Sequence, residues 1–122
     1  MRLLADIAVW GVALLHLFFL ALEMLLWDKP VGHRILGLDP DYARITKSLA
    51  ANQGLYNGFL AAGLIWSLLA EQSAINLQVF FLGCVIIAGI FGGITSSRKI
   101  IWIQALPAII ALILVFLAQS TY

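Results

Sequence analysis

The sequence predicts an all-α protein, an integral membrane four-helix bundle, and three observations lead to this fold class. Of the 122 residues, 63% are hydrophobic and 11% are charged, whereas soluble domains contain about 25% charged residues. Four long stretches carry no charged residue: 7–22, 48–70, 72–97 and 100–122. The last three exceed the roughly 20 residues that a helix needs to cross a bilayer, and the first reaches that length if it extends over residues 3–27.

We therefore expect a single transmembrane domain over residues 1–122. Its helices are predicted at about 3–27, 40–70, 74–96 and 99–118, with a cytoplasmic loop at 28–39. Since the four spans use nearly the whole chain, we expect no extramembrane domain that could hold a nucleotide fold or a soluble catalytic core. Any function is then expected in the bundle or in its short loops.

The first predicted helix ends at Trp27, which suits the headgroup region, and is followed by Asp28-Lys29-Pro30. It contains His16 and Glu23, which are seven residues apart and therefore share one face of the helix. At 1.5 Å per residue they are about 10 Å apart along the axis, too far for a direct hydrogen bond. A water molecule or a ligand could bridge them.

The second predicted helix has a clear start, with Asp39 as N-cap, Pro40 at the first helical position and Asp41 at the positive end of the helix dipole. Small residues then recur every four positions, a pattern that lets helix backbones approach closely. These are Ala50, Gly54, Gly58 and Ala62. Because polar residues occupy the neighbouring arc, we expect this helix to be the most enclosed of the bundle.

The third predicted helix repeats the small-residue pattern and is expected to pack closely against the second. Its small residues are Cys84, Ala88, Gly92 and Ser96, with Gly89, Gly93 and Ser97 beside them. The fourth carries Gln104 and Pro107. Pro107 removes a backbone hydrogen bond to the carbonyl of Ile103 and predicts a kink there.

The basic residues predict the orientation in the bilayer. Six of the seven lie in the first and third connections: Lys29, Arg34, Arg44, Lys47, Arg98 and Lys99. Because lysine and arginine accumulate on the cytoplasmic side, these connections are predicted to be cytoplasmic and both termini to be outside. The same residues are explained by topology and lipid headgroups, so we expect no nucleic-acid partner.

Polar residues from different helices are predicted to meet at one depth. Counted at 1.5 Å per residue, Glu23 lies roughly 6 Å inside Trp27 and Gln104 roughly 8 Å inside Lys99. This predicts a polar pocket within the membrane that opens toward the cytoplasm. Its candidate ligand-binding residues are His16, Glu23, Asn52, Gln53, Tyr56, Asn57 and Gln104.

A purely structural role is the alternative for each of these residues. Amides and tyrosines in membrane helices often only join helices, at about 0.6 kcal/mol per hydrogen bond. Glu23 could be satisfied by pairing with Arg98 or Lys99, since an unpaired carboxylate in the membrane is costly. His16 could be a satisfied bundle histidine, a proton carrier or a ligand contact. We expect no metal and no cofactor, because only His33 could supply a second imidazole.

Three segments carry a family resemblance: Leu22-Glu23-Met24 with Trp27, then Ala50-Ala51-Asn52-Gln53-Gly54-Leu55-Tyr56-Asn57-Gly58-Phe59, and Ser97-Arg98-Lys99. With these the chain resembles the bacterial domain-of-unknown-function family 1304, small four-span membrane proteins. The resemblance covers nearly the whole chain. It implies the fold and implies no biochemical activity.

Three functions remain open. The first is a small bundle, self-associating into a homo-oligomer in the lipid bilayer, that binds a small or lipophilic ligand in the polar pocket. The second is a proton-coupled exporter similar to the small multidrug transporters, although the six-to-one charge bias and the lack of an evident aromatic cage argue against it. The third is a membrane enzyme such as a lipid isomerase, with Glu23 and His16 as acid and base. The sequence favours a binding protein over an enzyme.

Overall fold

The computed structural model describes residues 1–120, so that residues 121 and 122 of the predicted domain lie outside the described residues. All regular structure in residues 1–120 is helical, which confirms the all-α class. The helices, in chain order, are α1 (Arg2–Leu20), the π-helical segment η1 (Ala21–Leu26), α2 (Pro30–Leu36), α3 (Pro40–Leu69), α4 (Ala74–Thr95), the π-helical segment η2 (Ile101–Ala105) and α5 (Leu106–Gln119).

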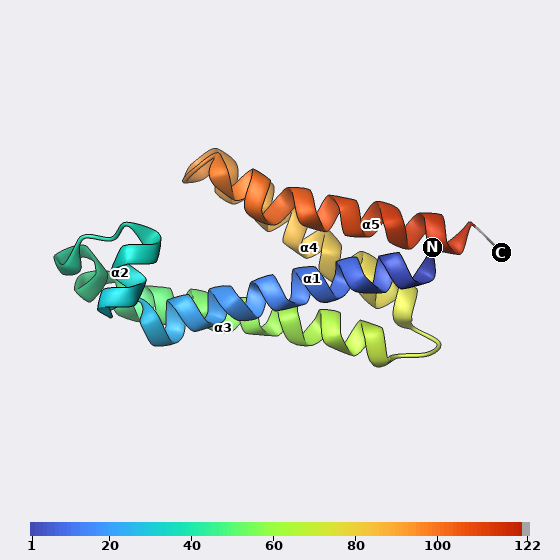
Figure 1. Ribbon diagram of the computed structural model, residues 1–122, viewed down its shortest axis with the longest axis horizontal. Helices are drawn as coiled ribbons and strands as arrows, with labels where there is room; N and C mark the ends of the chain where they lie inside the picture. The colour runs from blue at the N-terminus through green and yellow to red at the C-terminus, as the bar shows by residue number, and fades with distance from the viewer. Residues whose placement is uncertain (121–122) are drawn as a thin grey trace.

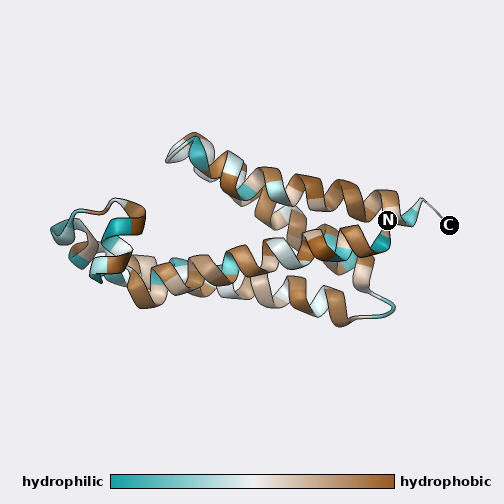
Figure 2. Cartoon of the chain, in the orientation of Figure 1, coloured by the Kyte–Doolittle hydropathy of each residue, from teal (hydrophilic) through white to brown (hydrophobic). Residues whose placement is uncertain are grey.

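Three of the described helices are long and apolar enough to cross a membrane: Arg2–Leu26, Ala74–Thr95 and Ile101–Gln119. Helix α3 is as long as any of them but is more polar, because it begins with a charged turn and carries Asn52, Gln53 and Asn57 further along. Four membrane-spanning helices therefore stay a prediction. Figure 2 shows the apolar residues along the long helices and the hydrophilic ones concentrated at their ends.

The start of α3 is as predicted. Asp39 has an extended backbone, and its side chain accepts a hydrogen bond from the backbone N–H of Asp41, with Pro40 at the first helical position. The predicted connection at 28–39 contains a short helix, α2, that was not expected from the sequence. Pro30 begins this short helix and Gly37 ends it with a left-handed φ of 64°, a conformation that favours glycine.

The four long helices lie side by side, with α2 at one end and the start of α1 and the end of α5 at the other (Figure 1). We name these ends the α2 end and the terminal end. The shared core lies toward the terminal end and is built largely from alanine and valine, whose small side chains allow close approach. Its buried members are Ala5, Val9, Val12, Ala13, Leu64, Leu82, Val85, Ala108, Ala111, Val115 and Ala118.

Toward the α2 end the helices separate into two pairs. η1 packs on α3 and α2, whereas η2 packs on α4 and α5, and Figure 1 shows the α4–α5 turn diverging from α1 and α3. The small-residue stripes hold each pair together. A Cβ at Gly54 would lie 2.7 Å from Met24 Cγ, and a Cβ at Gly89 would lie 2.7 Å from the backbone nitrogen of Ala105.

These contacts overturn the predicted pairing of the second and third helices through their stripes. Gly54 and Gly58 meet the α1–η1 helix, and Gly89 and Gly93 meet η2. α3 and α4 do contact each other, but at Gly63, which lies directly against the ring of Phe81. The prediction that α3 is the most enclosed helix is also wrong, since its outer face is exposed at large apolar residues: Ile45, Leu49, Leu55, Tyr56, Phe59, Trp66 and Leu69.

Both π-helical segments lie at the α2 end. In η2 the wide turn immediately precedes Pro107, where the sequence predicts an interruption, and the backbone N–H of Leu106 bonds to the carbonyl of Ile101. A π-helical turn contains more residues than an α-helical turn. Side chains after such a turn are therefore rotated away from the positions expected for a regular α-helix.

Candidate functional site

A hydrogen bond between Glu23 and Asn57 lies at the centre of the candidate site. Asn57 Nδ2 donates to Glu23 Oε1 at 2.7 Å, which joins η1 to α3. Gly54 lies one turn before Asn57 on the same face, and its missing side chain lets α3 approach η1. The Asn57 side chain is buried, with 8% of the residue exposed, whereas Glu23 is half-buried.

Glu23 lines a cavity of about 390 Å³ between the two helix pairs, which we call the cleft. One wall comes from α1, η1, α2 and α3, and the other from the α4–α5 turn and η2. Its lining residues are Phe19, Leu22, Glu23, Trp27, Leu36, Gln53, Asn57, Ser96, Ile100 and Gln104. Of these lining residues Glu23 is the one with an ionisable side chain.

The far wall of the cleft is held by η2. Gln104 Nε2 donates to the carbonyl of Val85 at 3.5 Å, a long bond that connects η2 to α4. The close contact of Gly89 with Ala105 fixes the same two helices together. Gln104 thus stands on a rigid wall, and its weakly bound amide is available to a ligand.

A second cavity of about 270 Å³, which we call the groove, adjoins the cleft and shares Glu23, Trp27 and Gln53 with it. It continues along the outer side of α3, where Leu49 is 74% exposed. Its other lining residues are Tyr42, Thr46, Leu49 and Ala50. Glu23 can therefore be reached from between the helix pairs and from the outer surface of α3.

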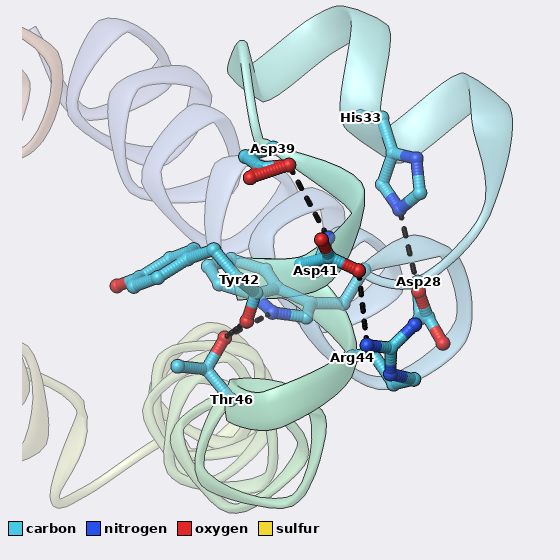
Figure 3. Close-up of polar contacts among 8 residues, drawn as sticks. Asp28, His33, Asp39, Asp41, Tyr42, Arg44 and Thr46 are labelled. Carbon is cyan, nitrogen blue, oxygen red and sulfur yellow. Dashed lines mark hydrogen bonds and ion pairs between the residues drawn. The ribbon is translucent and has the colours of Figure 1, made fainter.

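The end of η1 is fastened to the start of α3 by a short network (Figure 3). Trp27 Nε1 donates to Thr46 Oγ1 at 3.0 Å, and Thr46 Oγ1 donates to the carbonyl of Tyr42 at 2.7 Å. In the same region Arg44 pairs with Asp41 at 2.9 Å and His33 Nε2 lies 3.4 Å from Asp28. The network uses the indole N–H of Trp27, so Trp27 offers its ring surface to the cleft and the groove.

The structure brings together four of the seven predicted site residues. Glu23, Gln53, Asn57 and Gln104 line the cleft. Asn52 and Tyr56 do not line it: both are exposed on the outer side of α3, Tyr56 to 55%. Successive residues of a helix are about 100° apart around its axis. The contacts of Gly54 turn the face of α3 that carries Asn57 toward η1, so Asn52 and Tyr56 lie on other faces of α3.

His16 is fully buried in α1 and does not line the cleft. Its Nδ1 bonds to the carbonyl of Val12 at 2.9 Å, and its Nε2 has no hydrogen-bond partner among the described residues. The imidazole packs edge-on against Phe19, with ring centroids 5.5 Å apart. The geometry therefore does not support His16 and Glu23 as an acid and base acting on one substrate.

The predicted pairing of Glu23 with Arg98 or Lys99 is wrong for the described residues. The ion pairs within residues 1–120 are those of Arg44 and His33 at the α2 end, and Arg98 and Lys99 are exposed at the α4–α5 turn. That turn diverges from η1, which separates the charges. The Glu23 carboxylate accordingly faces the cleft with one amide as its polar partner.

Two aromatic residues of the cleft were missed as site residues. Trp27 was assigned only to the membrane interface, and Phe19 was not singled out, yet both line the cleft with Glu23. Each is four residues from Glu23 in the sequence, a spacing that places them on its face. The cleft thus has two aromatic lining residues that the sequence did not point to.

The family of the chain is shown by a match to a known family model. The model of the family described as "Protein of unknown function (DUF1304)" matches residues 11–116. The chain belongs to the DUF1304 family. This confirms the resemblance found in the sequence, and the matched residues include both walls of the cleft.

This DUF1304 protein is also similar to the uncharacterized protein YpaA of Lactococcus lactis subsp. lactis (strain IL1403). The two are 29% identical over 115 residues, which cover 93% of this chain and 97% of YpaA. No solved structure matches the chain. The family and the relative agree with an unknown activity, so function has to be inferred from the cleft.

Proposed function

We propose that this DUF1304 protein is a four-span membrane protein that binds a small, lipophilic ligand in the cleft. The observation that carries the proposal is the Glu23 carboxylate, held by Asn57 in a cavity whose other lining residues are neutral. Ligand sites are typically apolar cavities of this size with a few convergent polar groups. An ionisable residue within a membrane helix is also costly to keep unless it serves a purpose.

The cleft is proposed to open toward the cytoplasm. The distribution of basic residues supports this orientation. Arg2 lies at the terminal end, whereas four basic residues lie beside the α2 end: Lys29, Arg34, Arg98 and Lys99. Positive residues favour the cytoplasmic side. Both chain termini would then be outside.

Native mass spectrometry of the protein released from a neutral detergent tests ligand binding. We expect a bound small molecule on the wild type that is lost from Ser96→Phe, which fills the cleft from its far wall, and from Asn57→Ala. Asn52→Ala, which changes an exposed amide of the same helix, is the matched control and should retain the ligand. A wild-type protein that is ligand-free after gentle extraction, or a ligand retained by Ser96→Phe, would count against the proposal.

A proton-coupled exporter is the second candidate, favoured by a further cavity at the terminal end. This cavity of about 130 Å³ is lined by Arg2, Asp6 and Gln78, among others. The cleft and this cavity lie at opposite ends of the shared core, as two alternately opened sites would. Proteoliposomes with an internal pH dye decide this, because an exporter must release protons when its substrate is added and a binding protein must not.

We also propose that the protein forms a homo-oligomer through the outer face of α3. Asn52 and Tyr56 are exposed there on a surface that would otherwise meet lipid, and a second copy can satisfy such an amide. Cysteine cross-linking in membranes tests this in a Cys84→Ala background. Asn52→Cys should cross-link, whereas Ile87→Cys, at a position on α4 that is 71% exposed, should not.

A further inference from the structure

We infer that the ligand is an amphiphile with an ammonium head group, whose head binds at Glu23 in the cleft and whose apolar tail lies in the groove. This inference rests on the proposed function, that the cleft binds a ligand, and adds its chemical class. Three features support it. The Glu23 carboxylate has no ion-pair partner among the described residues, two aromatic residues line the cleft with it, and the cleft is continuous with the groove.

In its ionised form, the Glu23 carboxylate requires a cation as its partner. Within residues 1–120 the carboxylate accepts one hydrogen bond, from Asn57, and forms no ion pair. A carboxylate has two oxygens and about four acceptor sites, so most of its hydrogen-bonding capacity is unused. A neutral ligand would leave the charge uncompensated in a half-buried place, and an anionic one would be repelled.

The walls of the two cavities favour an ammonium over an anionic head group. No lysine or arginine is among the described residues lining the cleft or the groove, so a phosphate or sulfate would find no positive partner there. The available polar groups besides Glu23 are amides and hydroxyls, which accept hydrogen bonds as readily as they donate them.

Two aromatic residues line the cleft together with the carboxylate. Phe19 and Trp27 lie four residues before and after Glu23 and line the same cleft. Because Trp27 Nε1 already donates to Thr46, the indole presents its ring rather than its N–H. Aromatic faces attract organic cations electrostatically, and tryptophan does so most strongly.

The groove supplies the place for an apolar tail. It shares Glu23 and Trp27 with the cleft and continues along Leu49 and Ala50 on the outer side of α3. Leu49 is 74% exposed, so the groove is open and apolar on this side of α3. A ligand with its charge at Glu23 can thus keep its alkyl chain in an apolar environment.

The inference is tested with Trp27 as the sole tryptophan. Trp10, Trp66 and Trp102 are 41%, 58% and 68% exposed, so changing them to phenylalanine should leave the fold intact. The protein, in neutral detergent, is titrated with octyltrimethylammonium, octyl sulfate and octanol, and Trp27 fluorescence is followed. We expect saturable binding of octyltrimethylammonium alone, weakened roughly tenfold in Glu23→Gln, since the ion pair with the carboxylate is lost.

Glu23→Gln is a suitable variant because its amide oxygen can still accept the hydrogen bond from Asn57. Circular dichroism and size-exclusion chromatography check that it folds. If it does not, Phe19→Leu serves instead, because it keeps the charge and removes one ring. It should weaken octyltrimethylammonium binding severalfold, and octanol should show no saturable binding to it, as to the wild type.

The outcomes separate this inference from the proposed function. Equal binding of octanol and octyltrimethylammonium, unchanged in Glu23→Gln but blocked by Ser96→Phe, would overturn the ammonium ligand and leave the cleft as a binding site. A Trp27 signal that responds to none of the three compounds would overturn both. Saturable binding of octyl sulfate would overturn the ammonium assignment alone.

A lipid head group and a free amphiphile could both supply the ammonium, and native mass spectrometry distinguishes these sources. The protein is incubated with phosphatidylethanolamine or with phosphatidylglycerol at equal concentration. A phosphatidylethanolamine adduct that Glu23→Gln loses assigns the lipid as the source. The absence of a selective lipid adduct, together with octyltrimethylammonium binding, assigns a free amphiphile. Selective adducts of phosphatidylglycerol would contradict the inference.

Discussion

Glu23 and Asn57 are 34 residues apart in the sequence and are joined by a hydrogen bond of 2.7 Å. Glu23 is the ionisable residue among the described lining residues of the cleft. Asn57 belongs to the segment 50–59 of α3, which carries the family resemblance. The bond also fixes the rotation of η1 against α3. Stability and ligand binding should therefore both depend on this pair.

A double-mutant cycle of Glu23→Ala and Asn57→Ala should measure a coupling free energy of about 1 to 2 kcal/mol. Interhelical hydrogen bonds in membrane proteins average about 0.6 and reach about 1.7 kcal/mol, and an ionised acceptor strengthens the bond. The free energy of unfolding in mixed micelles is the measurement. Asn76→Ala, which changes an exposed amide of α4, is the control and should change it by less than about 0.5 kcal/mol. Additive single variants would show that the bond contributes nothing.

Gly54→Ala should destabilise the protein by about 1 to 3 kcal/mol, because its methyl group would lie 2.7 Å from Met24 Cγ and 3.0 Å from Glu23 Cβ. The matched control is Gly83→Ala, where nothing lies within 4 Å of the added atom. That variant should be neutral or slightly stabilising, since alanine favours helices more than glycine does. Equal unfolding free energies for the two variants would contradict the close packing of α3 against η1.

Gly89→Ala should be more harmful than Gly92→Ala. The added Cβ at Gly89 meets the backbone nitrogen of Ala105 at 2.7 Å, whereas at Gly92 it meets the side chain of Ile100 at 3.2 Å. A side chain can move aside and a backbone cannot without shifting η2. Thermal unfolding should show the difference, and Gly89→Ala should also weaken ligand binding, because Gln104 and Ile100 of the cleft wall move with η2. The reverse order of stability would contradict this contact.

His16→Leu should leave the protein as stable as the wild type or more stable by about 1 kcal/mol. Nε2 is buried without a partner, and a leucine of similar size removes that unpaired group. His16→Gln, which keeps buried polar atoms, is the control and should be destabilised. The unfolding free energies of both variants are compared. A loss of more than about 1 kcal/mol in His16→Leu would show that the imidazole has a stabilising partner in the membrane-embedded protein.

The depth of a residue along its helix predicted its place in the site better than the helix face on which it lies. Glu23 and Gln104 were placed at one level from their distances to the helix ends, and the structure places both in the cleft. Depth depends on the rise per residue, which is nearly constant along a helix. The rotation of each helix depends on what packs against it, so the exposure of Asn52 and Tyr56 did not follow from their spacing.

The sequence by itself determined the all-α class, the family, the start of α3 at Asp39 and Pro40, and the helix bounds to within a few residues, because hydrophobic length, capping residues and proline act locally. Only the tertiary structure decided which glycine stripe meets which helix, that the α4–α5 turn separates from η1, and that Glu23 faces Asn57 rather than a basic residue. These three features depend on contacts between segments that are distant in the sequence. They also depend on the π-helical turns η1 and η2, which change the direction in which the side chains that follow them point.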